Sequence, residues 1–265
     1  MSQPTGSMVP VDGTELYTAE EGAGPAILFV HGMCGNADVW ADQRRRLSDA
    51  HRCVSYDRRG HTRSPLGEGV ERSVELHADD AAALIEALGL APVLLVGSSG
   101  GARIGVDVAR RYPELLRGAV LSEPAIIGLA DDGGAAFIGE IRPKLQAASA
   151  PEAAVDAFFQ AIDPDLWAGA PEERKQDYRA NHVELFGDLA MPPYVPTPEE
   201  LGAIDVPIRL LVGERSRSIF GEIARRVFGT IPGAELIELP GATHATYATN
   251  PDAFEHAVRS FGPTG

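Results

Sequence analysis

Cysteines are scarce in this sequence, and long apolar segments are absent. The two cysteines, Cys34 and Cys53, are too few for a disulfide framework, and neither stands in a C-x-x-C or Cys/His spacing typical of a metal site. We expect both to be free thiols. No apolar run approaches the roughly 20 residues of a transmembrane helix, and residues 1–13 lack the basic start and apolar stretch of a secretory signal. We therefore expect a cytoplasmic protein with no membrane partner.

Basic residues are also few relative to acidic ones. The chain has 23 Lys and Arg against 38 Asp and Glu, a formal net charge of −15 at pH 7. Such a charge repels phosphate backbones and anionic lipid, which excludes nucleic acid and membrane surfaces as expected partners. A G-x-G-x-x-G segment with an acidic ribose partner is missing, and the histidines are not spaced as zinc ligands, so we expect no cofactor and no metal. A small-molecule substrate remains, and the sequence leaves open whether the chain forms a homodimer.

Short apolar runs predict the strands of a mostly parallel sheet. Residues 9–20 alternate around Asp12 and Gly13, a dipeptide that favours a tight hairpin, so we expect two antiparallel strands first. The later runs are bounded by turn residues, and several are continuously apolar, as in strands buried on both faces. These runs cover residues 26–30, 52–56, 93–96, 118–121, 208–212 and 234–239.

Helical periodicity lies between the predicted strands, most clearly over residues 74–88. Alternating strands and helices imply an α/β fold with a mostly parallel, eight-stranded sheet and helices on both faces, with ligand sites beyond the carboxyl ends of the strands. From residue 125 to residue 200 this alternation stops, and Ala-rich helical stretches with scattered prolines replace it. We predict a core domain of residues 1–124 and 201–265 with an inserted helical cap of residues 125–200.

Residues 97–101 (GSSGG) form the most informative motif. They follow a predicted strand and precede a helical segment, the context in which G-x-S-x-G indicates a nucleophilic serine on a sharp turn. Side chains two positions before and after that serine would collide with neighbouring backbone. This requirement selects Ser99, because a frame centred on Ser98 would include Val96. The Gly100 amide, at a helix N-terminus, is then a natural oxyanion donor. The alternative is a Gly/Ser turn that only packs a helix against the sheet.

With this turn the chain resembles the α/β-hydrolase family over nearly its full length. Residues 30–33 (VHGM) look like the family's oxyanion segment. Residues 56–64 (YDRRGHTRS) look like its D-x-R-G-x-G-x-S loop, with Thr62 in place of the usual glycine. The resemblance implies that the Met33 amide is the second oxyanion donor and that Gly32 lets the backbone approach the substrate carbonyl.

A serine hydroxyl needs a base within hydrogen-bond reach before it can act as a nucleophile. Among the seven histidines, His244 alone stands in a short loop between a late strand and a final helix that begins near Pro251. The chain order Ser, acid, His places the base in that loop. We therefore predict His244 as the general base.

The expected acid departs from the family's usual pattern. Most members place Asp shortly after the glycine that closes the seventh strand, where this chain has Ser216, which cannot supply a negative charge. The preceding parallel strand ends at Glu123, one strand over at the same edge of the sheet. A minority of the family, including enzymes similar to zearalenone lactonase, uses glutamate there. We predict Glu123 as the acid, with Glu214 as the alternative and a purely structural Glu123 salt bridge as a third interpretation.

The resemblance implies a serine hydrolase that cleaves a carboxylic ester or lactone through an acyl-enzyme. Carbon–carbon bond hydrolases and cofactor-free peroxidase-like enzymes use the same Ser and His, and a noncatalytic small-molecule receptor on the same fold is a further alternative. Aromatic and apolar cap residues would line the pocket, and from them we predict substrate contacts for Trp167, Met191 and Tyr194. Such an apolar pocket favours a medium-sized ester or macrocyclic lactone over a small charged substrate.

Overall fold

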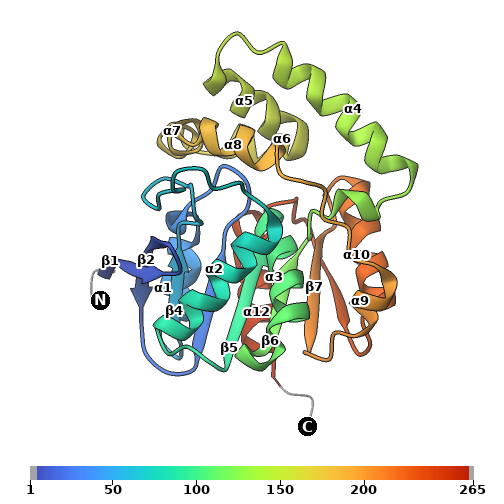
Figure 1. Cartoon of the computed structure of the whole chain (residues 1–265). Coiled ribbons are helices and arrows are strands. Elements are labelled where there is room, and N and C mark those ends of the chain that lie inside the picture. Colours follow the sequence, from blue (N-terminus) through green and yellow to red (C-terminus); the bar gives the residue numbers. More distant parts are fainter. Residues whose placement is uncertain (1–4, 263–265) are drawn as a thin grey trace.

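The computed structural model describes residues 5–262 and contains an eight-stranded sheet flanked by helices (Figure 1). The chain opens with an antiparallel hairpin of β1 (Thr5–Val11) and β2 (Thr14–Glu21). Gly13 in its turn has a φ of 71°, a left-handed conformation that glycine adopts without a steric penalty. The predicted hairpin around Asp12 and Gly13 is therefore confirmed.

The remaining strands follow the predicted runs and confirm the mostly parallel sheet. The strand order is β1-β2-β4-β3-β5-β6-β7-β8, and all neighbours from β4 to β8 pair in parallel. Every residue of β3, β5 and β7 is buried, because helices cover both faces, and this explains why these strands are mostly apolar. The strands are β3 (Ala26–Val30), β4 (Arg52–Tyr56), β5 (Val93–Ser98), β6 (Leu116–Ser122), β7 (Ile208–Gly213) and β8 (Glu235–Leu239).

Helices cover both faces of this sheet (Figure 1). One face carries α2 (Val74–Ala87), α3 (Gly100–Arg111) and α10 (Ser218–Thr230), and the other carries α1 (Ala41–Leu47) and α12 (Pro251–Arg259). None of the helices within residues 5–262 has the length and apolar character needed to cross a bilayer.

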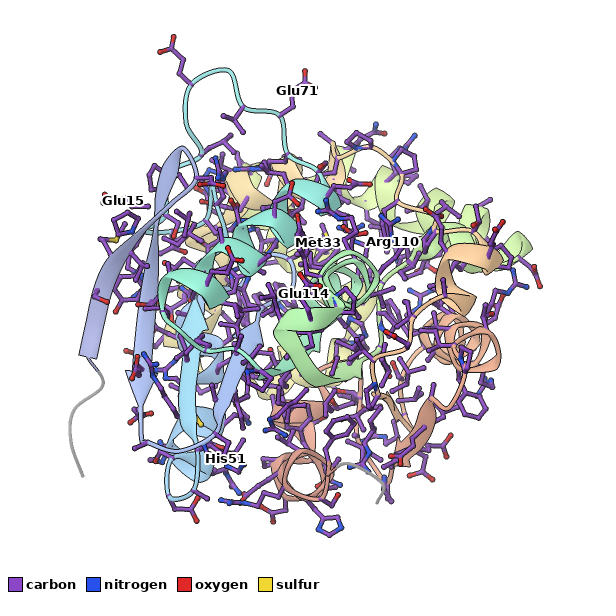
Figure 2. All side chains as sticks on the ribbon, turned by 60° about the horizontal axis from the view of Figure 1, so that its bottom comes forward. Glu15, Met33, His51, Glu71, Arg110 and Glu114 are labelled. Carbon is purple, nitrogen blue, oxygen red and sulfur yellow. The ribbon has the colours of Figure 1, made fainter. Side chains whose placement is uncertain are left out.

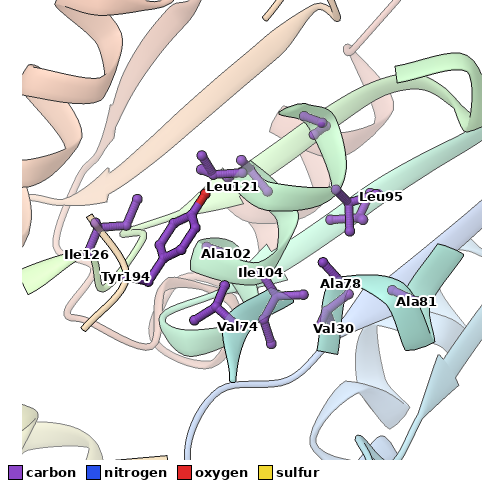
Figure 3. Close-up of a cluster of buried hydrophobic side chains, with 14 of the residues drawn as sticks. Val30, Val74, Ala78, Ala81, Leu95, Ala102, Ile104, Leu121, Ile126 and Tyr194 are labelled. Atoms are coloured by element: carbon purple, nitrogen blue, oxygen red, sulfur yellow. The ribbon is translucent and has the colours of Figure 1, made fainter. Parts of the chain in front are cut away.

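Two hydrophobic clusters, one on each face, hold these layers together. Side chains of β3 alternate between them: Phe29 packs against Trp40, with ring centroids 5.2 Å apart, while Val30 belongs to the opposite cluster. Figure 3 shows part of that opposite cluster, where Ala78 of α2 and Ile104 of α3 lie beside Val30. Cys34 and Cys53 are buried free thiols, as predicted.

Between β6 and β7 the chain leaves the sheet and forms helices that lie above it in Figure 1. We call α4 to α8 the cap helices. They are α4 (Asp132–Gln146), α5 (Pro151–Ile162), α6 (Pro164–Gly169), α7 (Glu172–Ala180) and α8 (His182–Leu189). The short helix α9 (Pro198–Gly202) packs against α10 and leads the chain back into β7.

Much of the acidic excess lies on the outside of the molecule, although several carboxylates, such as Glu123 and Asp188, are buried. Exposed carboxylates such as Glu15, Glu71 and Glu114 are spread over different elements, and Figure 2 shows Glu15 and Glu71 at the periphery. The negative charge therefore does not specify a single binding surface.

Candidate active site

Ser99 lies on a strained turn between β5 and α3. Its φ of 55° and ψ of −116° are unusual for a residue with a side chain. A Cβ atom at Gly97 would lie 2.6 Å from the Gly101 carbonyl oxygen, and one at Gly101 would lie 2.1 Å from the Val30 carbonyl oxygen. The turn therefore admits only glycine at both positions that frame Ser99. The Ser99 amide donates to the Ser122 carbonyl at 2.9 Å and ties the turn to β6.

The imidazole of His244 reaches Ser99 from the loop between β8 and α11 (Thr246–Thr249). Its Nε2 lies 2.9 Å from Ser99 Oγ. The Phe220 ring of α10 stacks on the imidazole, with centroids 3.9 Å apart and an interplanar angle of 25°. His244 is 7% exposed, so the ring is held by packing while it still borders the cavity described below.

Glu123 follows β6 directly and is fully buried. Its Oε2 accepts a 2.5 Å hydrogen bond from His244 Nδ1, and its Oε1 accepts a 2.8 Å bond from the Gly213 amide. Because a carboxylate can only accept, this contact puts the ring proton on Nδ1 and leaves the Nε2 lone pair facing Ser99.

Ser216 supplies a further donor to the same carboxylate. Its hydroxyl donates to Glu123 Oε2 at 2.7 Å, so the residue at the position expected for the acid instead bonds to the glutamate. Glu214, the alternative acid, is exposed, and its carboxylate accepts a 2.7 Å bond from the Gly241 amide. The geometry thus brings Glu123, and not Glu214, to His244.

The predicted oxyanion donors lie beside Ser99. The Met33 and Gly100 residues line the same cavity as Ser99, and neither amide has a hydrogen-bond acceptor within residues 5–262. A Cβ atom at Gly100 would be 3.6 Å from the Met33 nitrogen, so the two amides are neighbours. A Cβ atom at Gly32 would be 3.2 Å from the Ser99 Cβ, so a larger residue there would crowd the turn. Two free amides at this point can hold a negative oxygen.

The loop after β4 supports this segment without entering the site. Asp57 accepts from the Ala37 amide at 2.7 Å and from the Arg63 amide at 3.0 Å, so it pins this loop rather than entering the site. His31 is fully buried and its Nε2 accepts from the Arg58 amide, and burial lowers its pKa well below the usual value. Thr62 adopts a φ of 45°, which explains why glycine is usual at its position.

A cavity of about 220 Å³ lies between Ser99 and the cap helices. Its walls are mostly apolar, which suits the carbon skeleton of a small organic substrate. Its apolar lining includes Val39, Ile127, Phe137, Ile138, Ile141, Phe158, Phe159, Ile162, Leu166, Leu189, Met191 and Phe220.

Of the three cap residues predicted to bind substrate, only Met191 lines this cavity. The predictions for Trp167 and Tyr194 are wrong for the cavity beside Ser99. The Trp167 ring stacks on Phe159 at a centroid distance of 4.8 Å, and the Tyr194 hydroxyl donates to Asp107 at 3.1 Å. Both side chains are buried in protein contacts. Residue type alone does not predict which of the cap residues face the cavity.

Sequence reasoning missed Asp163, which binds the residues on both sides of His244. Its Oδ2 accepts from the Thr243 hydroxyl at 2.6 Å and from the Ala245 amide at 3.0 Å. Its Oδ1 accepts from the Leu166 amide at 3.1 Å and so caps the N-terminus of α6. In the sequence, Asp163 followed by Pro164 is an ordinary pattern for the start of a helix. Nothing in the sequence therefore distinguishes Asp163 from residues that only cap a helix.

Comparison with known proteins places this geometry in a family. Residues 27–257 match the sequence profile described as the alpha/beta hydrolase family. An uncharacterized hydrolase, YraK, of Bacillus subtilis is 39% identical over 120 residues, which are 45% of this chain and 44% of that protein. The 2-(acetamidomethylene)succinate hydrolase of Mesorhizobium japonicum is 28% identical over 96% of this chain and 93% of its own. The carboxylesterase CesB of Bacillus subtilis has the same fold, with a TM-score of 0.82, 21% identity, and coverage of 100% of this chain and 93% of its own.

Proposed function

The chain belongs to the alpha/beta hydrolase family, and on that basis we propose that it is a serine hydrolase that cleaves a carboxylic ester or lactone. The observation that carries the proposal is the continuous contact from Ser99 Oγ through the His244 ring to Glu123 Oε2, with distances of 2.9 and 2.5 Å. The relative named 2-(acetamidomethylene)succinate hydrolase, similar over 96% of this chain, supports hydrolysis as the class of reaction.

In the first half of the reaction Ser99 Oγ attacks the substrate carbonyl while His244 Nε2 takes its proton. Glu123 stabilises the imidazolium that results. The carbonyl oxygen becomes an oxyanion and accepts hydrogen bonds from the Met33 and Gly100 amides, donors that are typically worth about 3 kcal/mol each in the transition state. His244 then gives its proton to the departing alkoxide, and an acyl-enzyme remains on Ser99.

The second half repeats these steps with water as the nucleophile. His244 takes a proton from the water, the hydroxide attacks the acyl carbonyl, and the proton returns to Ser99 Oγ as the carboxylic acid leaves. For a lactone the leaving alcohol stays attached to the product, so ring opening needs no additional groups.

Turnover of 4-nitrophenyl acetate and butyrate, and of a panel of lactones, tests this proposal. We expect wild-type protein to release 4-nitrophenol and the Ser99→Ala variant to lose nearly all of that activity. A Ser98→Ala variant, which removes the neighbouring hydroxyl, should still release 4-nitrophenol, because Ser99 remains in place. Equal rates for wild type and Ser99→Ala, or no turnover of any ester or lactone, would overturn the proposal.

A further inference from the structure

Arg103 of α3 lines the cavity beside Ser99 without a partner for its charge. Its Nε atom is buried and lacks a hydrogen bond, and no ion pair within residues 5–262 includes the side chain, although the charge of Asp188 acts on it. The arginines with almost fully buried side chains, such as Arg58 and Arg59, do have ion-pair partners. Arg58 bonds to Asp188 at 2.6 Å and Arg59 bonds to Asp80 at 2.5 Å. An arginine remains charged in proteins, so a positive charge borders an otherwise apolar cavity.

The position of Arg103 on α3 directs its side chain toward the reacting carbon. Its amide donates to the Ser99 carbonyl at 3.0 Å, so the two residues are one helical turn apart, or about 6 Å along the axis. Side chains of a helix lean toward its N-terminus, which here is the Ser99 turn. A single small molecule can therefore contact Ser99 with its carbonyl and Arg103 with a second group.

The carboxylates around the cavity already have donors. Asp163 is held by the Thr243 hydroxyl and the Ala245 amide. Burial opposes ionisation of Asp188, but Arg58 beside it keeps the pKa of Asp188 well below its usual value, so these two charges neutralise each other. Asp188 Oδ1 nevertheless has no hydrogen-bond partner, so a contact with Asp188 is the structural alternative for Arg103.

We propose that Arg103 binds an anionic group of the substrate, which is thus an ester or lactone that also carries a carboxylate. A guanidinium can bind a carboxylate through two parallel hydrogen bonds, and such bonds are strong where water is excluded. The cavity of about 220 Å³ limits the substrate to a small molecule. This inference rests on the proposed function, and it revises the sequence-based expectation that a small charged substrate is disfavoured.

Matched ester pairs test the charge directly. On the acyl side we compare 4-nitrophenyl hemiglutarate with the uncharged 4-nitrophenyl pentanoate, after subtracting spontaneous hydrolysis. On the alcohol side we compare 4-carboxyphenyl butyrate with phenyl butyrate. We expect wild-type protein to prefer the charged member of at least one pair in kcat/KM.

The Arg103→Met variant should lower kcat/KM for the preferred charged ester about 10- to 100-fold, the range of a charge-assisted hydrogen bond, and mainly through KM. The neutral ester should change by less than about threefold. The Arg103→Lys variant should recover part of the preference, because it restores a point charge. Arg225→Met, which removes an exposed arginine of α10, is the matched control and should leave both esters unchanged.

Competitive inhibition by glutarate provides a second readout without turnover, and we expect Arg103→Met to weaken it by a similar factor. The inference is overturned if wild-type protein shows no preference for either charged ester. It is also overturned if Arg103→Met slows charged and neutral esters equally, the result expected from a structural contact with Asp188. Failure of the proposed function looks different, because then wild-type protein would hydrolyse neither member of either pair.

Discussion

Replacing Glu123 by glutamine exchanges one carboxylate oxygen for an NH₂ group and reverses two hydrogen bonds. Glu123 accepts three bonds, two at Oε2 from His244 and Ser216 and one at Oε1 from the Gly213 amide. A glutamine keeps one acceptor oxygen, which the Gly213 amide requires. Its NH₂ group then faces Ser216, whose hydroxyl can turn to accept, and His244 Nδ1, which must also accept.

The ring proton of His244 consequently moves to Nε2, where it points at Ser99 and blocks proton transfer. By comparison with other Ser-His-acid sites, the wrong tautomer costs about four orders of magnitude in kcat. At about 1.36 kcal/mol per factor of ten, this loss equals about 5.4 kcal/mol of transition-state stabilisation. Because the two side chains have the same shape, we expect substrate binding and the folded state to survive the change.

Steady-state hydrolysis of 4-nitrophenyl butyrate measures the effect, with thermal unfolding to show that the variant is folded. Glu214→Gln is the matched control, since Glu214 is exposed and bonds to the Gly241 amide. We expect Glu214→Gln to retain the wild-type rate. A wild-type rate in Glu123→Gln together with a slow Glu214→Gln would refute the assignment of Glu123.

Three further changes test the surroundings of the site. Ser216→Ala removes one of the donors to Glu123 Oε2, so we expect kcat to fall about tenfold, the equivalent of one hydrogen bond, and a loss approaching that of Glu123→Gln would contradict this supporting role. Asp163→Asn weakens the hold on Thr243 and Ala245, so kcat should fall while the KM for a neutral ester stays nearly constant, and an unchanged kcat would argue against it. Burial lowers the pKa of His77 well below 6.5, so the unfolded chain binds its proton first as pH falls. The stability that neutral His77 provides is fully present above about pH 6.5 and is lost as the pH falls below it. We expect His77→Leu to reduce the slope of the unfolding free energy against pH by up to about 1.4 kcal/mol per pH unit below pH 6. An unchanged slope would show that His77 does not contribute.

Much of the fold was predictable because its strands are short, apolar and bounded by turn residues. The run at residues 26–30 matches β3 at both ends, since all five of its residues are buried between helices. The run at 118–121 begins two residues late relative to β6, because Arg117 is polar although it belongs to the strand. Strand order was beyond reach, as it depends on crossovers that no local pattern contains.

Local constraints also explain which parts of the site could be predicted. The glycines around Ser99 are required by backbone contacts, so their spacing carried the information. The residues that line the cavity follow no such regular spacing in the sequence. Trp167 and Met191 are both apolar cap residues, yet Trp167 packs on Phe159 whereas Met191 lines the cavity. In the sequence Arg103 is one more charge on a helix, and only its place on the cavity wall without an ion-pair partner distinguishes it.

Covalent labelling with a fluorophosphonate, located by mass spectrometry of peptides, examines the nucleophile itself. We expect one adduct per chain, on Ser99, with no adduct in Ser99→Ala and much slower labelling in His244→Ala, because the imidazole activates the hydroxyl from 2.9 Å. A folded wild-type protein that stays unlabelled, or that is labelled at another serine, would contradict the assignment of Ser99 as the nucleophile.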